Sequence, residues 1–481
     1  MPTLTTTIQQ IDPASSQYLA VTQRDNGQEV CRHTFAYAPG LLVNLEPQWM
    51  LDKAVPRQAA DVNRSADPAA QQEQAKVTQQ LREYGRRLYA YLFGDGADLA
   101  AFLKYSDDNR SPLRLILSMH GSAAPLWQLP WEYLHDGADF LALNGRFQIS
   151  RRPEGLGELA IDPVALPLRI LVIIAAPDDQ HLLDTEEEIG VIQDALDEVL
   201  RAELVQVAYV DDATLDNIGE QLRSFRPHVL HYTGHGAYDQ SQARSFLVLE
   251  DDNGQSRPAG IGELRPHLQH APDLRLVLLS GCQTAQTSAL DAFSGVATGL
   301  LQANVPAVLA MQFSILDSSA IKLAGAFYRA LARGDSLSEA LSQSRIALWQ
   351  FDAGPGYDWG IPALYLRTPD LRLVDAASAR PNLAAASSPA ALINVEGLPL
   401  PRHFVGRKSE LRQLRRALGD NGIKSLFLRG IGGIGKSSSA AKLIQRPGHL
   451  LDGVCVIRCH ETDALDIPGK LASFLQGRGE A

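Results

Sequence analysis

Cysteine is scarce in this chain, with four residues among 481: Cys31, Cys282, Cys455 and Cys459. So few thiols cannot form a disulfide framework for a chain of this length, and we expect a reducing compartment, the cytoplasm. Long apolar runs are also missing, because no stretch approaches the roughly 18 residues of a membrane span. The start of the chain has no charged segment followed by an apolar one. We therefore expect neither a signal peptide nor a membrane partner.

Basic residues are outnumbered, with 44 Lys and Arg against 55 Asp and Glu and a net charge of −11 at pH 7. This balance argues against nucleic acid as the main partner. Hydrophobic content of 45% and charged content of 21% are ordinary for globular protein. The chain is too long for a single core, so we expect about two to four domains.

Strand and helix patterns alternate along the chain and predict an α/β fold with a mostly parallel, doubly wound sheet and helices on both faces. Residues 1–16 are predicted to be frayed, residues 18–37 to form a hairpin with its turn at Asn26-Gly27, and residues 54–74 to form a loop. The aliphatic residues 168–174 are predicted to form a strand that is buried on both faces. The predicted segments are a smaller α/β unit (17–152), a main α/β domain (165–372), a linker (375–401) and the first part of a nucleotide-binding domain (402–481).

Two predicted strands end in small residues followed by a reactive side chain. Residues 230–234 lead to His235, and residues 278–281 lead to Cys282. Open α/β sheets place their chemistry at the carboxyl ends of strands, and a His about 50 residues before a Cys is typical of caspase-type nucleophiles. An imidazole lowers the pKa of a nearby thiol and can protonate the leaving amine, while the N–H groups of Gly236 and Cys282 could stabilise an oxyanion. Taken singly, the Cys could be a small core residue and the His a turn residue.

The residues around this pair resemble the CHAT domain, a caspase-like peptidase group related to separase. The resemblance covers roughly residues 17–370. The matching segments are 129–134, which begins Leu-Pro-Trp-Glu, and 231–236, 279–285, 305–312, 326–331 and 359–365.

The resemblance implies a caspase-like sheet and a peptidase that needs no cofactor. It makes His235 the general base and acid, Cys282 the nucleophile and Gly236 an oxyanion donor. Asp317 would be the carboxylate that holds a basic P1 side chain, although it could equally cap a helix. The unit 17–152 would correspond to a pseudo-protease half.

A second motif, residues 430–437, fits G-x-x-x-x-G-K-[ST] between a predicted strand (425–428) and a predicted helix (438–444). Lys436 would reach the β- and γ-phosphates of ATP, ADP or GTP, and Ser437 would bind Mg²⁺. The remaining phosphate-binding residues are predicted to be Gly430, Gly432, Gly433, Gly435 and Ser438. Residues 404–407 resemble the start of STAND-type NTPases such as NB-ARC proteins. No Walker-B acid follows, so we expect nucleotide binding without support for hydrolysis, and a sensor region beyond residue 481.

These features predict a latent cysteine endopeptidase that acts on a protein or peptide after Arg or Lys. The nucleotide-binding module would switch it and could drive oligomerisation, the missing C-terminal region would recognise the trigger, and Arg380 is a candidate self-processing site. Bacterial defence or programmed death is the role that the resemblance suggests. One alternative is an inactive caspase-like adaptor whose signal is carried by the NTPase. A second alternative, a protein that is mainly an ATPase, is not supported by the partial P-loop domain.

Overall fold

The structure of this chain is a computed structural model that falls into two compact units. The first comprises residues 1–183 and 187–380, and the second comprises residues 184–186 and 381–481. The residues described are 2–12, 14–38, 68–105, 112–180, 185–210, 212–239, 241, 244–281, 289–313, 315, 317–351, 356–368, 371–375, 392–394, 411, 414, 429, 436–445, 453–455 and 469.

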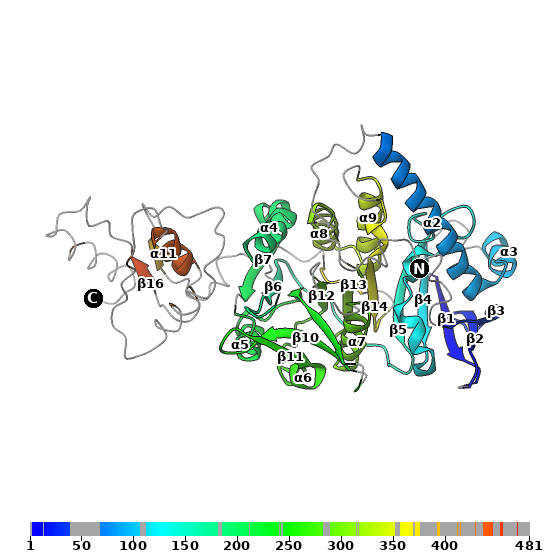
Figure 1. The fold of residues 1–481 in the computed structure, drawn as a ribbon, viewed down its shortest axis with the longest axis horizontal. Helices are drawn as coiled ribbons and strands as arrows, with labels where there is room; N and C mark the ends of the chain where they lie inside the picture. Colours follow the sequence, from blue (N-terminus) through cyan, green and yellow to red (C-terminus); the bar gives the residue numbers. More distant parts are fainter. Residues whose placement is uncertain are drawn as a thin grey trace. The chain divides into compact units, whose positions relative to one another are not determined.

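The first unit is built on one 11-stranded sheet with the order β3-β2-β1-β4-β5-β14-β13-β12-β8-β6-β7 (Figure 1). Strand β2 is antiparallel to both its neighbours and β13 is antiparallel to β14, whereas the other neighbours are parallel. The predicted α/β class with a mostly parallel sheet is thus confirmed. The strands are β1 (Thr3–Gln10), β2 (Gln17–Arg24), β3 (Glu29–Ala36), β4 (Leu113–Met119), β5 (Phe147–Pro153), β6 (Leu168–Ile174), β7 (Val205–Val210), β8 (Val229–Gly234), β12 (Leu276–Gly281), β13 (Ala307–Met311) and β14 (Pro362–Leu366).

Helices cover both faces of this sheet (Figure 1). One face carries α2 (Pro68–Phe93), α4 (Thr185–Arg201), α8 (Asp317–Ala332) and α9 (Leu337–Trp349), and the other carries α5 (Leu215–Phe225), α6 (Ile261–Gln269) and α7 (Ala289–Gln302). Helix α3 (Ala97–Tyr105) contacts β3, and the short 3-10 helices are η2 (Gly121–Gln128), η3 (Trp131–Tyr133) and η4 (Asp358–Gly360). A small three-stranded sheet, ordered β11-β10-β9, contains β9 (Gly236–Asp239), β10 (Arg244–Glu250) and β11 (Ser256–Gly260).

Burial on both faces explains the near-continuous aliphatic sequence of β6. Ile170 and Val172 join the core under α4, α8 and α9, whereas Leu171 and Ile173 join the core under α5, α6 and α7. Successive side chains of a strand point to opposite faces, so a strand covered on both sides must be apolar throughout.

Local signals define the helix ends. The Thr214 hydroxyl accepts a hydrogen bond from the Asn217 N–H at 3.3 Å and caps α5. Ser336 and Glu339 form a reciprocal capping box at the start of α9. Each cap satisfies backbone N–H groups that have no partner within the helix.

The two predicted units 17–152 and 165–372 contribute to the same sheet. They meet where β5 lies beside β14, and Tyr365 and Arg151 are the one residue pair in the described ladder between these strands. The rings of Trp127 and Tyr365 stack nearby at 5.9 Å. Side-chain packing therefore joins the two halves at this seam more than backbone pairing does.

Two sequence-based expectations for the first unit were wrong. Residues 1–16 are not frayed throughout, because β1 lies between β2 and β4 in the sheet. Its alternation of Thr with Leu and Ile is a strand pattern with β-branched residues, which the polar composition obscured. Helix α2 begins at Pro68, inside the predicted loop 54–74.

The described part of the second unit includes two short parallel strands and a helix with defined bounds. Strand β15 (Leu392–Asn394) pairs with β16 (Gly453–Cys455), and α11 spans Lys436–Gln445. Residues 392–394 lie inside the stretch predicted to be a linker, so the end of that stretch has regular structure. The strand consists of Leu392, Ile393 and Asn394, of which the β-branched Ile393 favours a strand, and it pairs with a segment distant in sequence.

Candidate active site

Three adjacent parallel strands, β8, β12 and β13, end at one edge of the sheet. Gly234 pairs with Gly281, and Leu279 pairs with Ala310. His235 follows β8 directly and Gln312 follows β13 directly. The carboxyl ends of parallel strands are the usual location of functional groups in α/β folds. The strands that lead to His235 and Cys282 are therefore adjacent, as predicted.

His235 is held by its main chain at the junction between the large sheet and the small one. Its carbonyl oxygen accepts a hydrogen bond from the Val248 N–H at 2.9 Å and one from the Tyr232 hydroxyl at 2.8 Å. The residue is only 5% exposed. Anchoring of the backbone limits the directions in which the imidazole can point, as a positioned catalytic base requires.

Gly234 makes the contact between Tyr232 and His235 sterically feasible. A Cβ at this position would lie 2.6 Å from the Tyr232 hydroxyl oxygen and 3.0 Å from the Ala175 Cβ. A side chain would therefore displace Tyr232 from the carbonyl of His235. The glycine before the histidine thus has a packing reason that is independent of substrate access.

The N–H of Gly236 is directed away from β10. Gly236 faces Leu247 across the antiparallel pair of β9 and β10, while the Val248 N–H donates to the preceding carbonyl, that of His235. This pattern makes Gly236 and Leu247 a non-hydrogen-bonded pair, in which the two residues point their amide groups outward. The ladder between β9 and β10 therefore does not use the Gly236 N–H, and its role as an oxyanion donor stays a prediction.

The other two residues predicted for peptidase chemistry are only partly covered. Cys282 lies outside the described residues, immediately after Gly281. Asp317 is the first residue of α8, and its side chain lies outside the description. An acidic residue in the first helical turn is favoured by the helix dipole, so this position is compatible with both the pocket and the helix-start interpretations.

The two other histidines near β8 belong to the core. Burial lowers the pKa of His231 to about 4, and its Nδ1 lies 3.3 Å from the hydroxyl of Tyr328. Burial is also the main cause that lowers the pKa of His228 to about 3, where Nδ1 accepts from the Arg169 N–H at 3.1 Å. Both imidazoles are neutral at pH 7 and are buried in the fold.

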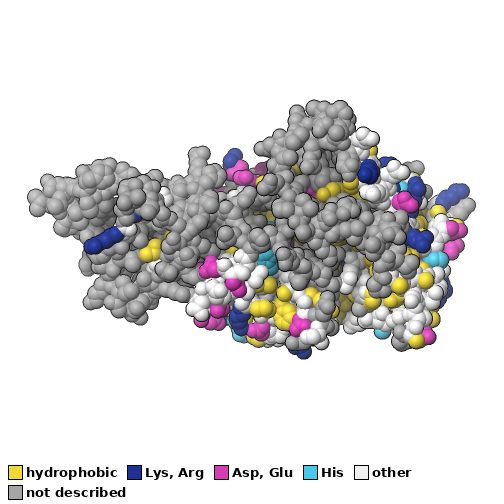
Figure 2. Space-filling model, in the orientation of Figure 1, with side chains coloured by type: hydrophobic (Ala, Val, Ile, Leu, Met, Phe, Trp, Pro, Cys, Tyr) yellow, Lys and Arg dark blue, Asp and Glu magenta, His cyan; other side chains and the backbone are white. Residues whose placement is uncertain are grey.

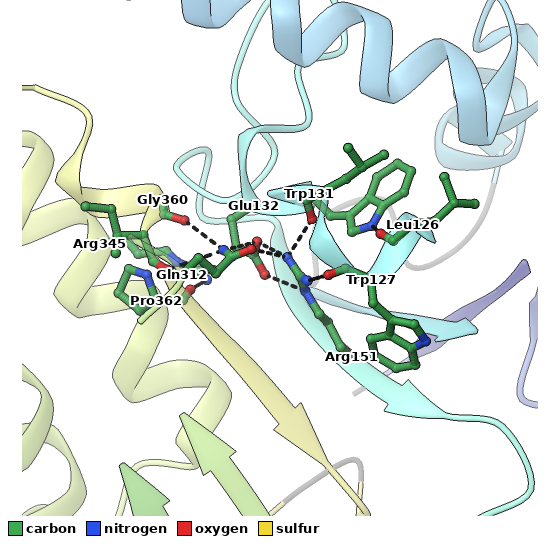
Figure 3. Close-up of polar contacts among 11 residues, drawn as sticks. Leu126, Trp127, Trp131, Glu132, Arg151, Gln312, Arg345, Gly360 and Pro362 are labelled. Atoms are coloured by element: carbon green, nitrogen blue, oxygen red, sulfur yellow. Dashed lines mark hydrogen bonds and ion pairs between the residues drawn. The ribbon is translucent and has the colours of Figure 1, made fainter. Parts of the chain in front are cut away.

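A buried polar network at the seam was not predicted as functional (Figure 3). Arg151 donates from Nε to Glu132 Oε1 at 3.1 Å and from Nη2 to Glu132 Oε2 at 2.5 Å and to Gln312 Oε1 at 2.9 Å. The Gln312 Nε2 donates to Glu132 Oε2 at 2.8 Å. Although burial acts to lower the pKa of Arg151, Glu132 raises it above its ordinary value. A charged residue within the apolar segment 129–134 is the sequence signal for this network, because a buried carboxylate requires partners.

The described part of the motif that is predicted to bind nucleotide is its helix. α11 begins at Lys436, and Ser437 is exposed while Ser438 is half-buried. The N–H groups at a helix start favour phosphate oxygens, so a lysine and a serine at the first two helical positions fit a bound nucleotide with Mg²⁺. Gly430, Gly432, Gly433 and Gly435 lie outside the described residues, as does Arg380.

The described surface carries charges of both signs. On the face shown in Figure 2, Lys and Arg side chains are interspersed with Asp and Glu. Within the described ranges, no group of three or more His, Cys, Asp or Glu residues is arranged to hold a metal ion. None of the helices described is both long and apolar enough to cross a membrane.

Fold and site together define an α/β protein with candidate chemistry at the carboxyl ends of parallel strands. The CHAT domain family model matches residues 82–370, which is more than half of the chain. This chain therefore belongs to the CHAT-domain family. Membership supports a cysteine peptidase in general.

Comparison with solved structures gave similar folds, among them the following. The separase–securin complex of Saccharomyces cerevisiae is similar in two crystal structures, with TM-scores of 0.41 and 0.39, identities of 10% and 12%, and coverage of 76% of this chain in both. The match spans 30% of the separase-complex chain. The RgpB pro- and mature domains of Porphyromonas gingivalis have a TM-score of 0.39 at 12% identity, with 63% of this chain and 78% of that chain covered. A comparison with curated protein sequences gave no match.

Proposed function

We propose that this protein is a cysteine endopeptidase in which His235 and Cys282 form the catalytic dyad. The observation that carries the proposal is the pairing of Gly234 with Gly281, the residues that directly precede the two members of the dyad. Adjacent strands lie about 5 Å apart, so a His and a Cys that leave neighbouring strands in register are within reach of each other.

The proposed chemistry is acyl transfer through a thioester. The Cys282 thiolate attacks the scissile carbonyl carbon, and the π electrons move to oxygen, where the N–H of Gly236 and that of Cys282 stabilise the negative charge. Collapse of this intermediate breaks the C–N bond while His235 gives its proton to the leaving amine. A water molecule then attacks the thioester, His235 accepts a proton from it, and Cys282 leaves as thiolate.

The substrate is proposed to be a protein or peptide with Arg or Lys at P1. Asp317 at the start of α8 supports this preference, because α8 follows β13, a strand whose neighbour β12 leads to Cys282. A carboxylate pairs bidentately with an arginine side chain. The same preference makes Arg380 a candidate site of self-processing.

The second unit is proposed to bind ATP, ADP or GTP and to switch the peptidase, as in STAND-type proteins. Lys436 would contact the β- and γ-phosphates, Ser437 would bind Mg²⁺, and Ser438 with the preceding glycines would surround the phosphates. The start of α11 at Lys436 supports this assignment. Loss of labelled-nucleotide binding in Lys436→Ala, with retention in Lys442→Ala on the same helix, would be the expected result; equal binding by both variants would contradict it.

The peptidase proposal is tested with a fluorogenic peptide library, the full chain, and its Cys282→Ala variant. Cleavage after Arg or Lys that disappears in the variant is the expected result. Cleavage after another residue would keep the dyad and contradict the assignment of Asp317. The assay is run with and without Mg-ATP, because a latent enzyme requires its activated state.

The alternative function is a caspase-like adaptor without catalysis. Selective alkylation of Cys282 separates the two hypotheses, because an activated thiolate reacts with iodoacetamide much faster than an ordinary thiol. The buried Cys31, whose pKa is raised by burial, is an internal reference. No cleavage, together with alkylation of Cys282 no faster than that of a free thiol in any nucleotide state, would favour the adaptor.

The proposed setting is the bacterial cytoplasm, in defence or programmed-death signalling. The scarcity of cysteine supports a reducing compartment. A toxic effect of the wild-type chain in bacteria that depends on both Cys282 and Lys436 would support the role, and unchanged toxicity in either variant would contradict it.

A further inference from the structure

The network of Glu132, Arg151 and Gln312 is fully enclosed. Glu132 and Arg151 are 0% exposed and Gln312 is 3% exposed. Arg151 also donates to the carbonyl oxygens of Trp127 at 2.7 Å and Leu129 at 3.0 Å. Charges removed from water require this kind of multiple pairing, so the three side chains are confined to one arrangement.

The orientation of the Gln312 amide is fixed by its two charged neighbours and by the carbonyls of Ile361 and Gly360, which accept from Nε2 at 3.3 Å and 3.5 Å. Its Oε1 accepts from Arg151, and its Nε2 donates to Glu132 (Figure 3). A rotation of the amide by half a turn would place the NH₂ group against the guanidinium and the oxygen against the carboxylate. The positions of the acid and the guanidinium therefore determine which way the Gln312 amide faces.

Gln312 also lies where the chain leaves the candidate active-site edge. It follows the last residue of β13, and its main-chain N–H donates to the Ile361 carbonyl at 3.1 Å. From this point the chain runs to Asp317 at the start of α8. A residue held by side chain and main chain at this point sets the direction in which the chain proceeds.

Glu132 and Arg151 come from the N-terminal half of the sheet, whereas Gln312 comes from the half that contains β8 and β12. The ladder between β5 and β14 contains a single described pair, and this network is a buried polar link between the two halves of the sheet. A displacement of η3 or β5 would be transmitted to Gln312.

We propose that Gln312 is a positioning residue through which the N-terminal half controls the chain entering α8, and hence substrate recognition by Asp317. This inference rests on the proposed peptidase function. Gln312 does not touch the reacting atoms; it acts on the P1 contact by fixing the segment that leads to it.

The test uses the full chain with Gln312→Met, which keeps the size of the side chain but removes the hydrogen bonds to Arg151 and Glu132 together with the longer ones to the carbonyls of Gly360 and Ile361. We expect the KM for an Arg-P1 peptide to rise about tenfold, which corresponds to the loss of a charge-assisted hydrogen bond. The rate at which iodoacetamide alkylates Cys282, which needs no P1 contact, should stay within about twofold. Gln128→Met, an exposed glutamine at the end of η2, is the matched control. An equal fall in alkylation and peptide binding, or an unchanged KM, would overturn the proposal.

A swap variant keeps the test independent of folding defects. Gln312→Glu alone places two carboxylates on Arg151, but Glu132→Gln combined with Gln312→Glu restores one acid, one amide and one guanidinium. Rescue of KM by the double variant supports a specific positioning network, whereas a wild-type KM in Gln312→Glu alone overturns it.

Hydrogen–deuterium exchange separates this inference from the peptidase proposal. Amides of residues 312–323 should exchange faster in Gln312→Met than in wild type, while those of β6 should not change. This result is expected whether or not the chain cleaves peptides. An absence of peptide cleavage would therefore contradict only the proposed function. Exchange of residues 312–323 at the wild-type rate in Gln312→Met would contradict the positioning role.

Discussion

The two halves of the sheet each contain a parallel strand that ends in a histidine followed by glycine. In the N-terminal half β4 leads to His120 and Gly121, and in the other half β8 leads to His235 and Gly236. The local sequences are alike, yet the surroundings of the two imidazoles differ.

His120 is exposed, and its Nδ1 lies 2.8 Å from the Ser122 hydroxyl and accepts from the Ser122 N–H at 3.1 Å. Strand β4 lies beside β5, and its last residue, Met119, pairs with Pro153 of β5. His235 is buried, and the strand beside β8 ends at Gly281, directly before Cys282. A His-Gly pair at a strand end is therefore a helix-capping element in one half and a candidate catalytic element in the other.

The residues at the end of the neighbouring strand therefore determine which chemistry such a histidine can take part in. The N-terminal half offers no cysteine at the corresponding strand end and instead supplies Glu132 and Arg151 to the seam. Its contribution to function would then be mechanical support of the candidate site.

The largest expected difference between the halves is in catalysis. His235→Ala should lower kcat/KM for a cleavable peptide by roughly 10²–10⁴-fold, because a general base and acid contributes about that much. His120→Ala should change kcat/KM by less than about twofold, as for a surface substitution away from the chemistry. Initial-rate measurements on both variants give kcat/KM, and a similar loss of kcat/KM in both would contradict the difference between the two histidines.

The supporting role of the N-terminal half predicts a large effect on stability. Arg151→Met removes the guanidinium that donates two hydrogen bonds to the buried carboxylate of Glu132, which should lower the free energy of unfolding by about 3–5 kcal/mol. The control is Arg152→Met in the neighbouring position, whose partner Glu158 is exposed and lies 3.3 Å away. Its loss should cost at most about 1 kcal/mol. Urea denaturation of both variants measures the difference, and equal midpoints would contradict the importance of the seam.

The sequence was most informative where one signal dominated. The aliphatic run of β6 and the strand leading to His235 were placed correctly because burial on both faces leaves a continuous apolar pattern. The hairpin of β2 and β3 was also predicted, from its Asn26-Gly27 turn.

The sequence was least informative where distant segments define the structure. Strand β1 is polar in composition and gains its place from pairing with β4, more than 100 residues away. The pairing of Glu132 with Gln312 likewise joins residues 180 positions apart. Local patterns carry the tendency to form a strand, but not the identity of its partner.

Acid should destabilise the half that contains β8. Because burial lowers the pKa of His231 to about 4, the unfolded chain takes up a proton more readily than the folded protein does. The resulting stability is complete above the unfolded pKa of about 6.5 and is lost as the pH falls toward 4. His231 should account for about 1–2 kcal/mol between pH 7.5 and 5.

Denaturation of His231→Gln and wild type at both pH values measures this contribution. The dependence on pH should be shallower in the variant, whereas His120→Gln, which alters the exposed histidine of the other half, should retain the wild-type slope. Parallel slopes for His231→Gln and wild type would show that the buried imidazole is not the source.

The smallest expected change in stability concerns the hydrogen bond between His120 and Ser122. Ser122 bonds His120 and also accepts from the Gln10 N–H at 3.1 Å, so Ser122→Ala should lower the free energy of unfolding by about 0.5–1.5 kcal/mol. Ser224→Ala, which removes an exposed hydroxyl that donates to the Glu220 carbonyl within α5, is the control and should cost only a few tenths of a kcal/mol. Peptide cleavage should not change in either variant. A loss of cleavage in Ser122→Ala at constant stability would mean that the histidine of the N-terminal half takes part in function, and the contrast between the two His-Gly elements would then fail.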